Sequence, residues 1–120
     1  NNERELLKMF SENGWRAVRV AGSGVNEESP CDLIAGRKGR KFAIECKSTK
    51  KNIQYISKSQ MEDFIIFSEM IGLNPLIAIK FFREGWLFIN PKKMRDAGKN
   101  WAISLEQAKS FGKRFGQLIS

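Results

Sequence analysis

Three charged residues, Asp32, Glu45 and Lys47, have the types and the spacing of a hydrolytic site. Alternate residues of a strand point to the same side, so Glu45 and Lys47 share one face of a strand predicted over residues 41–47. A turn at residues 36–40 folds this strand back on a short strand predicted over residues 31–35. We therefore expect Asp32 to meet Glu45 and Lys47 at one end of a hairpin.

Two carboxylates held this close favour a divalent cation, because without one they repel each other and one tends to take up a proton. Mg²⁺ prefers oxygen ligands, binds through one or two protein carboxylates and fills its shell with water and substrate phosphate. Such an ion activates water and stabilises charge on phosphorus, and Lys47 can orient the water or offset that charge. We expect Asp32 and Glu45 to hold Mg²⁺, with Mn²⁺ as an alternative ion. The competing interpretation is a Glu45–Lys47 pair on a solvated strand face.

The composition excludes several other hydrolytic chemistries. The chain of 120 residues has no histidine, which excludes Ser-His-Asp and Cys-His nucleophilic schemes and zinc bound by histidine. Its two cysteines, Cys31 and Cys46, are too few for a disulfide framework and are expected to be small buried strand residues.

Positive charge indicates an anionic partner. Lysine and arginine outnumber acidic residues 21 to 13, which gives a net charge of +8 and favours nucleic acid first and an anionic membrane surface second. Eight basic residues and one acid, Glu45, lie between residues 37 and 58. Basic side chains of this kind contact phosphates without reading sequence. From this segment we predict DNA contacts by Arg37, Lys38, Lys50, Lys51 and Lys58; the alternative is an ordinary solvated run of charge.

The pattern of apolar residues predicts one α/β domain over residues 1–120, with a mixed β-sheet flanked by helices. Helices are predicted over 2–13 and 59–72 and from residue 104 to about 115, and the second and third begin with Ser-x-x-Glu and Ser-x-x-Gln capping boxes at Ser59 and Ser104. Strands are predicted over 15–20, 31–35, 41–47, 76–82 and 86–90, the last two forming a hairpin around Glu84 and Gly85.

The helix over 59–72 has more apolar residues than one buried face requires. Met61, Phe64, Ile65, Ser68 and Ile71 form one stripe, while Ile66, Phe67 and Met70 lie outside it. The surplus indicates a second buried surface, most simply a homodimer contact, to which we assign Phe64, Phe67 and Ile71. The alternative is packing against the C-terminal helix of the same chain.

Several short motifs resemble a known family. The set Pro30-Cys31-Asp32 and Glu45-Cys46-Lys47 resembles the PD-(D/E)xK nuclease motif. The segments ERELL (3–7), VRVAGSG (18–24), CDLIAG (31–36), AIECKSTKK (43–51) and IAIKF with GWLF (77–88) resemble, in order, the motifs of archaeal Holliday junction resolvases, including those of archaeal viruses. The nuclease motif alone is weak, but the ordered set covers about three-quarters of the chain.

The resemblance implies a restriction-endonuclease-like fold with a central mixed five-stranded β-sheet, a homodimer, and Mg²⁺-dependent paired nicking of a four-way DNA junction. It implies that Glu3 joins Asp32 and Glu45 as a metal-site acid and that Lys47 is the catalytic lysine. It also implies that Ser23 is a catalytic loop serine and that Arg4 and Arg19 contact DNA near the scissile phosphate.

Two other functions remain open at this point: a nuclease of linear duplex DNA, and a non-catalytic basic DNA-binding module. The first would need an element that reads the major groove, and the sequence offers no spare helix or insertion for it. The second would tolerate neutral residues at Asp32 and Glu45. We expect a cytoplasmic protein of an archaeal cell or a virus-infected host, not secreted, without a membrane partner or a nucleotide cofactor, because no apolar run reaches the roughly 20 residues of a membrane helix.

Overall fold

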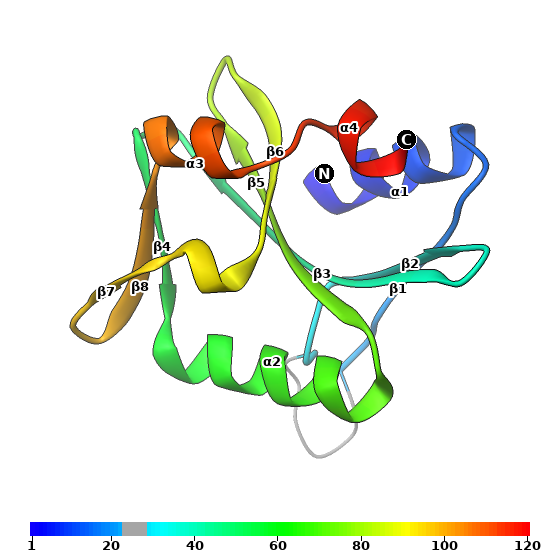
Figure 1. The fold of residues 1–120 in the computed structure, drawn as a ribbon, viewed down its shortest axis with the longest axis horizontal. Coiled ribbons are helices and arrows are strands. Elements are labelled where there is room, and N and C mark those ends of the chain that lie inside the picture. Colours follow the sequence, from blue (N-terminus) through cyan, green and yellow to red (C-terminus); the bar gives the residue numbers. More distant parts are fainter. Residues whose placement is uncertain (23–28) are drawn as a thin grey trace.

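The computed structural model describes residues 1–22 and 29–120, in which four α-helices surround two β-sheets (Figure 1). The larger sheet has the order β1-β2-β3-β5-β6 and consists of Arg16–Arg19 (β1), Leu33–Arg37 (β2), Arg40–Thr49 (β3), Asn74–Phe81 (β5) and Gly85–Ile89 (β6). The smaller sheet has the order β4-β8-β7 and consists of Ile53–Ser57 (β4), Asn100–Ser104 (β8) and Arg95–Ala97 (β7). The helices are Asn2–Glu12 (α1), Lys58–Ile71 (α2), Leu105–Phe111 (α3) and Phe115–Ile119 (α4), and a 3-10 turn covers Pro91–Lys93.

The hairpin that was expected to build the site is present. Strands β2 and β3 pair antiparallel around a turn in which Lys38 and Gly39 have φ of 48° and 85°, the left-handed conformations that a tight hairpin turn requires. The chain then passes through β4 and α2 before β5 returns parallel to β3, and β5 and β6 form the second predicted hairpin. The mixed five-stranded sheet is thus confirmed.

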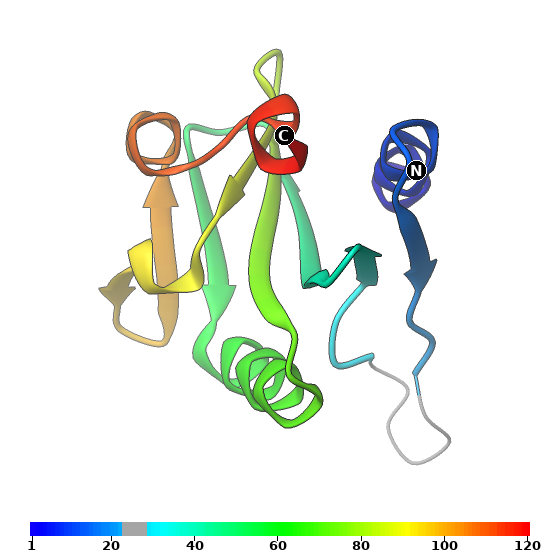
Figure 2. The same ribbon diagram turned by 45° about the vertical axis from the view of Figure 1, so that its right-hand side comes forward.

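Helices cover both faces of this sheet, with α2 on one side and α1 and α4 on the other (Figure 2). The α2 side buries Met61 and Phe64 against Ala43, Ile77 and Ile79. On the opposite side a second cluster joins α1 and α4 to the sheet, made of Leu6, Phe10, Trp15, Leu33, Ala35, Phe42, Ile44, Ala78, Trp86, Phe88 and Leu118. The middle of β3 is therefore buried on both faces.

The smaller sheet was not predicted. Its strands are three to five residues long, and β4 lies in the segment between residues 47 and 59, for which no element was predicted. The pairing of β4 with β8 joins residues 43 to 51 positions apart, from Ser57 with Asn100 to Ile53 with Ser104, so local alternation carries little information about it.

The predicted C-terminal helix is two helices. The Ser104 capping box is confirmed, with Gln107 as its partner, but the chain becomes extended at Gly112. A Cβ at Gly112 would lie 2.5 Å from both the Ala108 carbonyl oxygen and the Ile89 Cδ1, so only glycine fits this close approach to β6. Lys113 then pairs with Phe88, so the segment covers the edge of the sheet instead of extending the helix.

Helix α2 also differs from its prediction. Its N-cap is Ser57, whose hydroxyl accepts from the Gln60 N–H at 3.2 Å, so the capping box predicted at Ser59 is wrong by two residues. Of the predicted stripe, Met61, Phe64 and Ser68 are buried, whereas Ile71 is exposed. Within residues 1–22 and 29–120 no helix is long and apolar enough to cross a membrane.

Candidate active site

Asp32 lies where β2 and β3 separate, level with Glu45. Leu33 pairs with Ile44, and one residue earlier the Asp32 N–H donates to the Ile44 carbonyl oxygen at 3.0 Å. The Asp32 carboxylate accepts from the Cys46 N–H at 2.7 Å through Oδ2. The side-chain carboxylate thus accepts a hydrogen bond from a β3 backbone N–H, as a carbonyl of a neighbouring strand would, and this holds it beside β3.

Glu45 is a buried carboxylate in the middle of β3. Its residue is 5% exposed, so the interpretation of a solvated strand face is wrong. Oε2 of Glu45 accepts a short hydrogen bond from Nε2 of Gln60, which comes from the first turn of α2. Burial, and then the neighbouring charge of Asp32, raise the pKa of Glu45 to about 8.

Lys47 completes the arrangement on the same face of β3. Its Nζ donates to Oε1 of Gln60 at 3.0 Å. The Gln60 amide therefore connects the carboxylate to the ammonium, and it fixes the orientation of both. Gln60 is a site residue that the sequence interpretation missed.

The pair Asp32 and Glu45 fits a hard divalent cation. Both offer carboxylate oxygens, and a bound cation would offset the burial and the Asp32 charge that together raise the pKa of Glu45. Among the described residues no three acidic, histidine or cysteine side chains form one metal-binding group. Glu3 therefore does not join Asp32 and Glu45 in this structure.

Glu3 instead pairs with Arg19 across α1 and β1. Oε2 of Glu3 lies 3.1 Å from Nε and 3.0 Å from Nη2 of Arg19. The negative charge of Glu3 also contributes to the raised pKa of Cys46, after burial and Asp32, so Glu3 lies within electrostatic range of β3. Two predicted functional residues thus meet each other, next to the site and not inside it.

The chain matches the family described as archaeal Holliday junction resolvase (Hjc) over residues 1–117. It belongs to this family. Among curated proteins it is 43% identical over 118 residues to the crossover junction endodeoxyribonuclease Hjc of Methanocaldococcus jannaschii, covering 98% of this chain and 83% of that protein. The Hjc enzyme of Archaeoglobus fulgidus is 34% identical over 129 residues, covering 98% of this chain and 94% of that protein.

A solved structure agrees with the sequence matches. The crystal structure of Archaeoglobus fulgidus Hjc, titled as a Holliday junction resolvase from an archaeal hyperthermophile, superposes with a TM-score of 0.85 at 29% identity and covers 98% of this chain and 91% of that one. The restriction-endonuclease-like fold expected of an archaeal Holliday junction resolvase is confirmed.

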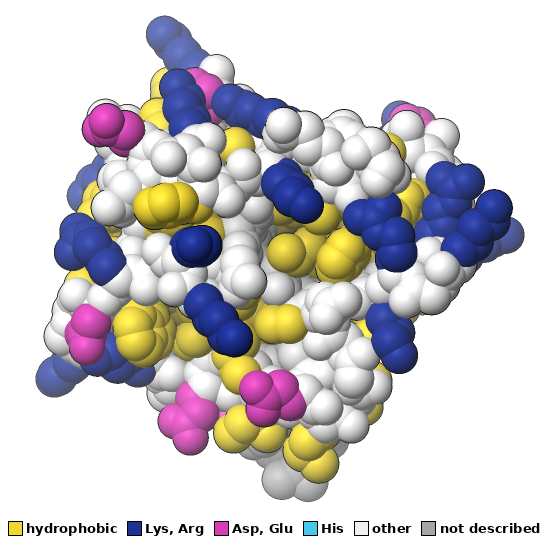
Figure 3. Space-filling model, in the orientation of Figure 1, with side chains coloured by type: hydrophobic (Ala, Val, Ile, Leu, Met, Phe, Trp, Pro, Cys, Tyr) yellow, Lys and Arg dark blue, Asp and Glu magenta, His cyan; other side chains and the backbone are white. Residues whose placement is uncertain are grey.

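The basic residues assigned to DNA contact spread over several elements. Arg37 and Lys38 lie at the β2–β3 turn, where Lys and Arg side chains gather at the right-hand end of the molecule (Figure 3). Lys50 and Lys51 are exposed after β3, and Arg4 is exposed on α1. Lys58 differs from these, because Nζ binds Oδ1 of Asp96 at 2.8 Å and lies 5.0 Å from the centre of the Trp101 ring.

The residues assigned to the dimer interface do not form one surface. Phe64 is 1% exposed and packs in the core of its own chain, so its assignment as a contact residue is wrong. Phe67 is partly buried against the same core, whereas Ile66, Met70 and Ile71 project outward. Because these three remain exposed, the C-terminal helices do not cover this face of α2, and the alternative interpretation is wrong.

Ser23 lies outside the described residues. Arg19 and its neighbour Val18 are both exposed, since β1 is the edge strand of its sheet. Position at the sheet edge, not alternation, leaves Arg19 available.

Proposed function

We propose that this chain is a structure-selective endonuclease that resolves four-way DNA junctions by paired phosphodiester hydrolysis as a homodimer. Residues 1–120 would form one nuclease domain, acting on DNA in the cytoplasm of an archaeal cell or of a cell infected by an archaeal virus. The observation that carries the proposal is the buried Glu45 carboxylate, held beside Asp32 and joined to Lys47 through Gln60. Membership of the resolvase family supports the choice of substrate.

Asp32 and Glu45 are the residues that would hold Mg²⁺ or Mn²⁺. When bound, such an ion supplies a water molecule of lowered pKa and a positive charge next to the phosphate. The donor set fits, because both ligands are carboxylates, and binding would allow Glu45 to ionise at neutral pH despite its burial.

Lys47 would contact the scissile phosphate, and Gln60 would hold Lys47 in position. The ammonium of Lys47 is held 3.0 Å from the Gln60 amide oxygen, so its position is set before DNA arrives. A fixed positive charge near the scissile phosphate is worth more than a mobile one, because no reorganisation is needed as negative charge develops. Gln60 therefore positions two groups without needing to contact the substrate itself.

A homodimer would supply the second centre that paired cutting needs. The exposed face of α2, formed by Ile66, Met70 and Ile71 with the edge of Phe67, is the surface that we assign to it. Ile71→Glu places a charge on this face and should give a monomer by analytical ultracentrifugation. Val18→Glu is the matched control, since Val18 is 58% exposed and Ile71 57%, and it should leave the dimer intact. A monomeric wild type, or two dimeric variants, would contradict the assignment.

The proposed activity is tested with end-labelled synthetic four-way junction and linear duplex of the same sequences. We expect symmetric nicks in the junction alone, and only when Mg²⁺ is present. Cutting of the linear duplex at the same rate would instead identify a general nuclease. Tight junction binding without cutting under any divalent ion would identify a DNA-binding module.

A further inference from the structure

The tip of the β5–β6 hairpin carries an exposed aromatic ring among positive charges. Phe82 is 57% exposed and lies in the turn between β5 and β6, with the Arg83 guanidinium carbon 5.2 Å from its ring centre. Lys and Arg side chains and hydrophobic atoms lie together at this tip, at the top of the molecule (Figure 3). Phe82 is not one of the residues of the candidate active site described above.

A pocket lies against the ring. It has a volume of about 520 Å³, within the range of roughly 300–1,000 Å³ that ligand sites occupy. Its lining includes Thr49, Lys50, Lys80, Phe82 and Arg83, with three positive charges and no acidic side chain. Lys80 is paired with Glu5 at 2.7 Å, whereas Lys50 and Arg83 have no ion-pair partner in the described part of the chain. The pocket is thus complementary to a ligand that combines a flat ring with negative charge.

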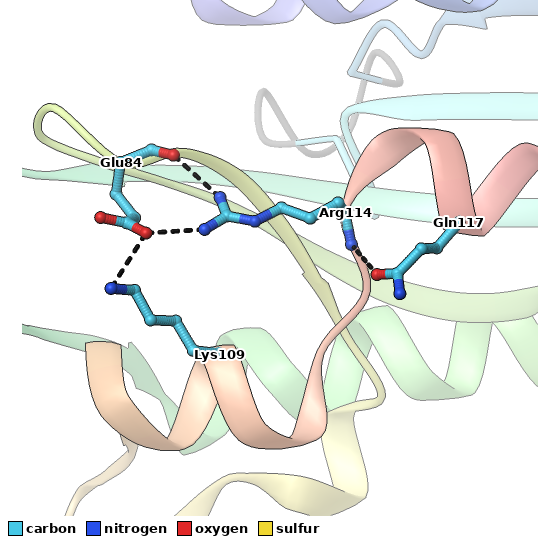
Figure 4. A network of polar contacts seen from close by, with 4 residues as sticks. All are labelled: Glu84, Lys109, Arg114 and Gln117. Atoms are coloured by element: carbon cyan, nitrogen blue, oxygen red, sulfur yellow. Dashed lines mark hydrogen bonds and ion pairs between the residues drawn. The ribbon is translucent and has the colours of Figure 1, made fainter.

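Ion pairs and a hydrogen bond from α3 and the start of α4 hold the hairpin tip. The Glu84 carboxylate accepts from Arg114 Nη2 at 2.6 Å and from Lys109 Nζ at 3.0 Å, and Arg114 Nη1 donates to the Glu84 carbonyl oxygen at 2.8 Å (Figure 4). Arg83 itself has φ of 63°, a conformation that a non-glycine residue adopts only when its surroundings fix it. The one acid of the turn, Glu84, is therefore paired with α3 and the start of α4. It does not neutralise Arg83, which remains beside the exposed Phe82 ring.

The pocket lies farther along β3 than the active-site residues, at the end of the strand. Thr49 follows Lys47 by two residues, a rise of roughly 7 Å in a strand. The Phe82 N–H donates to the Thr49 carbonyl oxygen at 3.0 Å, which ties the hairpin to the end of β3. A DNA strand whose phosphate lies at Lys47 could thus place a neighbouring nucleotide at Phe82.

We propose that this pocket binds one unstacked nucleotide at the branch point of the junction, with its base on Phe82 and its phosphates near Lys50 and Arg83. The inference rests on the proposed function. A nucleotide at a branch point has lost a stacking neighbour, so taking it out of the stack costs less than in an intact duplex. Aromatic rings compensate for that loss by stacking, and every base has a face to offer. The pocket therefore favours branched over linear DNA without reading sequence.

The test is binding without cutting, measured on wild-type protein and Phe82→Ala in the presence of a chelator. We expect Phe82→Ala to weaken binding of the four-way junction by roughly tenfold, because one base–aromatic stack is lost, and to leave binding of linear duplex unchanged. Phe82→Trp should restore junction binding, whereas Phe82→Leu, which keeps an apolar side chain without a ring, should not. Phe111→Ala is the matched control, since Phe111 is 50% exposed and has its own cation, Lys93, but lies outside this pocket, and it should change neither affinity.

A fluorescent 2-aminopurine at each branch position gives a second readout. Its emission should rise at the bound branch position when wild-type protein binds, because the base leaves the DNA stack that quenches it, and should not rise with Phe82→Ala. Wild-type protein that binds junction and duplex equally would contradict the proposed function. A clear junction preference that Phe82→Ala leaves intact would contradict this inference alone. If Phe82→Ala weakened binding of both DNAs equally, Phe82 would be a general DNA contact, which overturns the inference. If Phe82→Ala changed the mass of the protein in sedimentation, the pocket would bind a protein partner, which also overturns it.

Discussion

Ile44 and Glu45 are neighbours on β3, both buried, and their side chains lie on opposite faces of the sheet. Ile44 is fully buried in the cluster under α1 and α4. Glu45 is almost as deeply buried on the α2 side, where Ala43, two residues earlier, belongs to the cluster that contains Met61 and Phe64. The same strand therefore buries an aliphatic side chain and a carboxylate at similar depth.

The two burials have opposite signs in free energy. Removing the Ile44 side chain from water stabilises the fold, whereas removing an ionised carboxylate costs several kcal/mol unless it is paired. Gln60 donates to Glu45, but Asp32 works against ionisation. Buried acids whose pKa is raised by burial and a neighbouring charge are enriched at functional sites, so we expect Ile44 to govern stability and Glu45 activity.

The largest effect on the stability side should come from Ile44→Ala. We expect it to lower the free energy of unfolding by about 2–5 kcal/mol, because it leaves a cavity in a close-packed cluster. Urea denaturation followed by circular dichroism measures this directly. Cleavage per folded molecule should stay near that of the wild type, and a selective loss of cleavage would show that the two faces of β3 are not separable.

On the active-site face, Lys47→Ala should lower the cleavage rate by roughly 10²–10³ with little change in stability, since it removes a positioned charge from the reacting phosphate. Single-turnover cleavage of the four-way junction, beside a thermal melt, gives both quantities. Lys51→Ala is a control of the same residue type from the exposed run after β3. Equal losses in the two variants would mean that Lys47 acts only through general attraction of DNA.

The metal-free protein should lose stability as the pH rises. The folded state keeps a proton on Glu45 up to a pKa of about 8, whereas the unfolded chain loses it near the ordinary glutamate pKa of 4.5. The stabilising effect of that proton is therefore complete below about pH 4.5 and is lost as the pH rises to about 8, for a change on the order of a few kcal/mol.

Thermal melts in a chelator between about pH 5 and pH 8.5 test this, with Glu45→Gln as the reference that cannot titrate at this position. Glu5, Glu84 and Asp96 have lowered pKa values, each first through hydrogen bonds from lysine, so their contributions fall outside this window. The wild type should lose stability relative to Glu45→Gln as the pH rises, and Mg²⁺ should reverse the loss. Parallel curves for the two proteins would contradict the raised pKa.

A smaller effect is expected from Gln60→Ala. It removes one donor from the Glu45 carboxylate and should slow cleavage by roughly tenfold at neutral pH. Because that hydrogen bond lowers the pKa of Glu45, its loss should also move the pH profile of cleavage upward. A slower rate with an unmoved profile would mean that Gln60 supports Lys47 alone.

The hairpin that pairs Asp32 with Glu45 could be predicted from the sequence because its causes are local. Two-residue alternation sets which side chains share a face, and the Lys38-Gly39 turn sets the register. The parallel return of β5 follows from the helix between the strands.

Gln60 could not be found in the same way. Its role depends on how α2 packs across β3, and a neutral amide carries no charge pattern to mark it. The misplaced N-cap hid it further, since a cap at Ser59 makes Gln60 the first residue of the helix, whereas the observed cap at Ser57 makes it the third. The ion pairs of Glu84 with Lys109 and Arg114 could not be predicted either, because these residues lie 25 and 30 positions away from it in the sequence.

We propose that the buried Glu45 carboxylate serves catalysis and lowers the stability of the metal-free fold. The variant Glu45→Gln tests both parts on one preparation. Junction cleavage with Mg²⁺, junction affinity and melting temperature at about pH 8 are measured together. We predict that cleavage falls by roughly three orders of magnitude, that affinity is retained and that the melting temperature is equal or higher. Full cleavage, or a loss of cleavage accompanied by a lower melting temperature, would contradict the account.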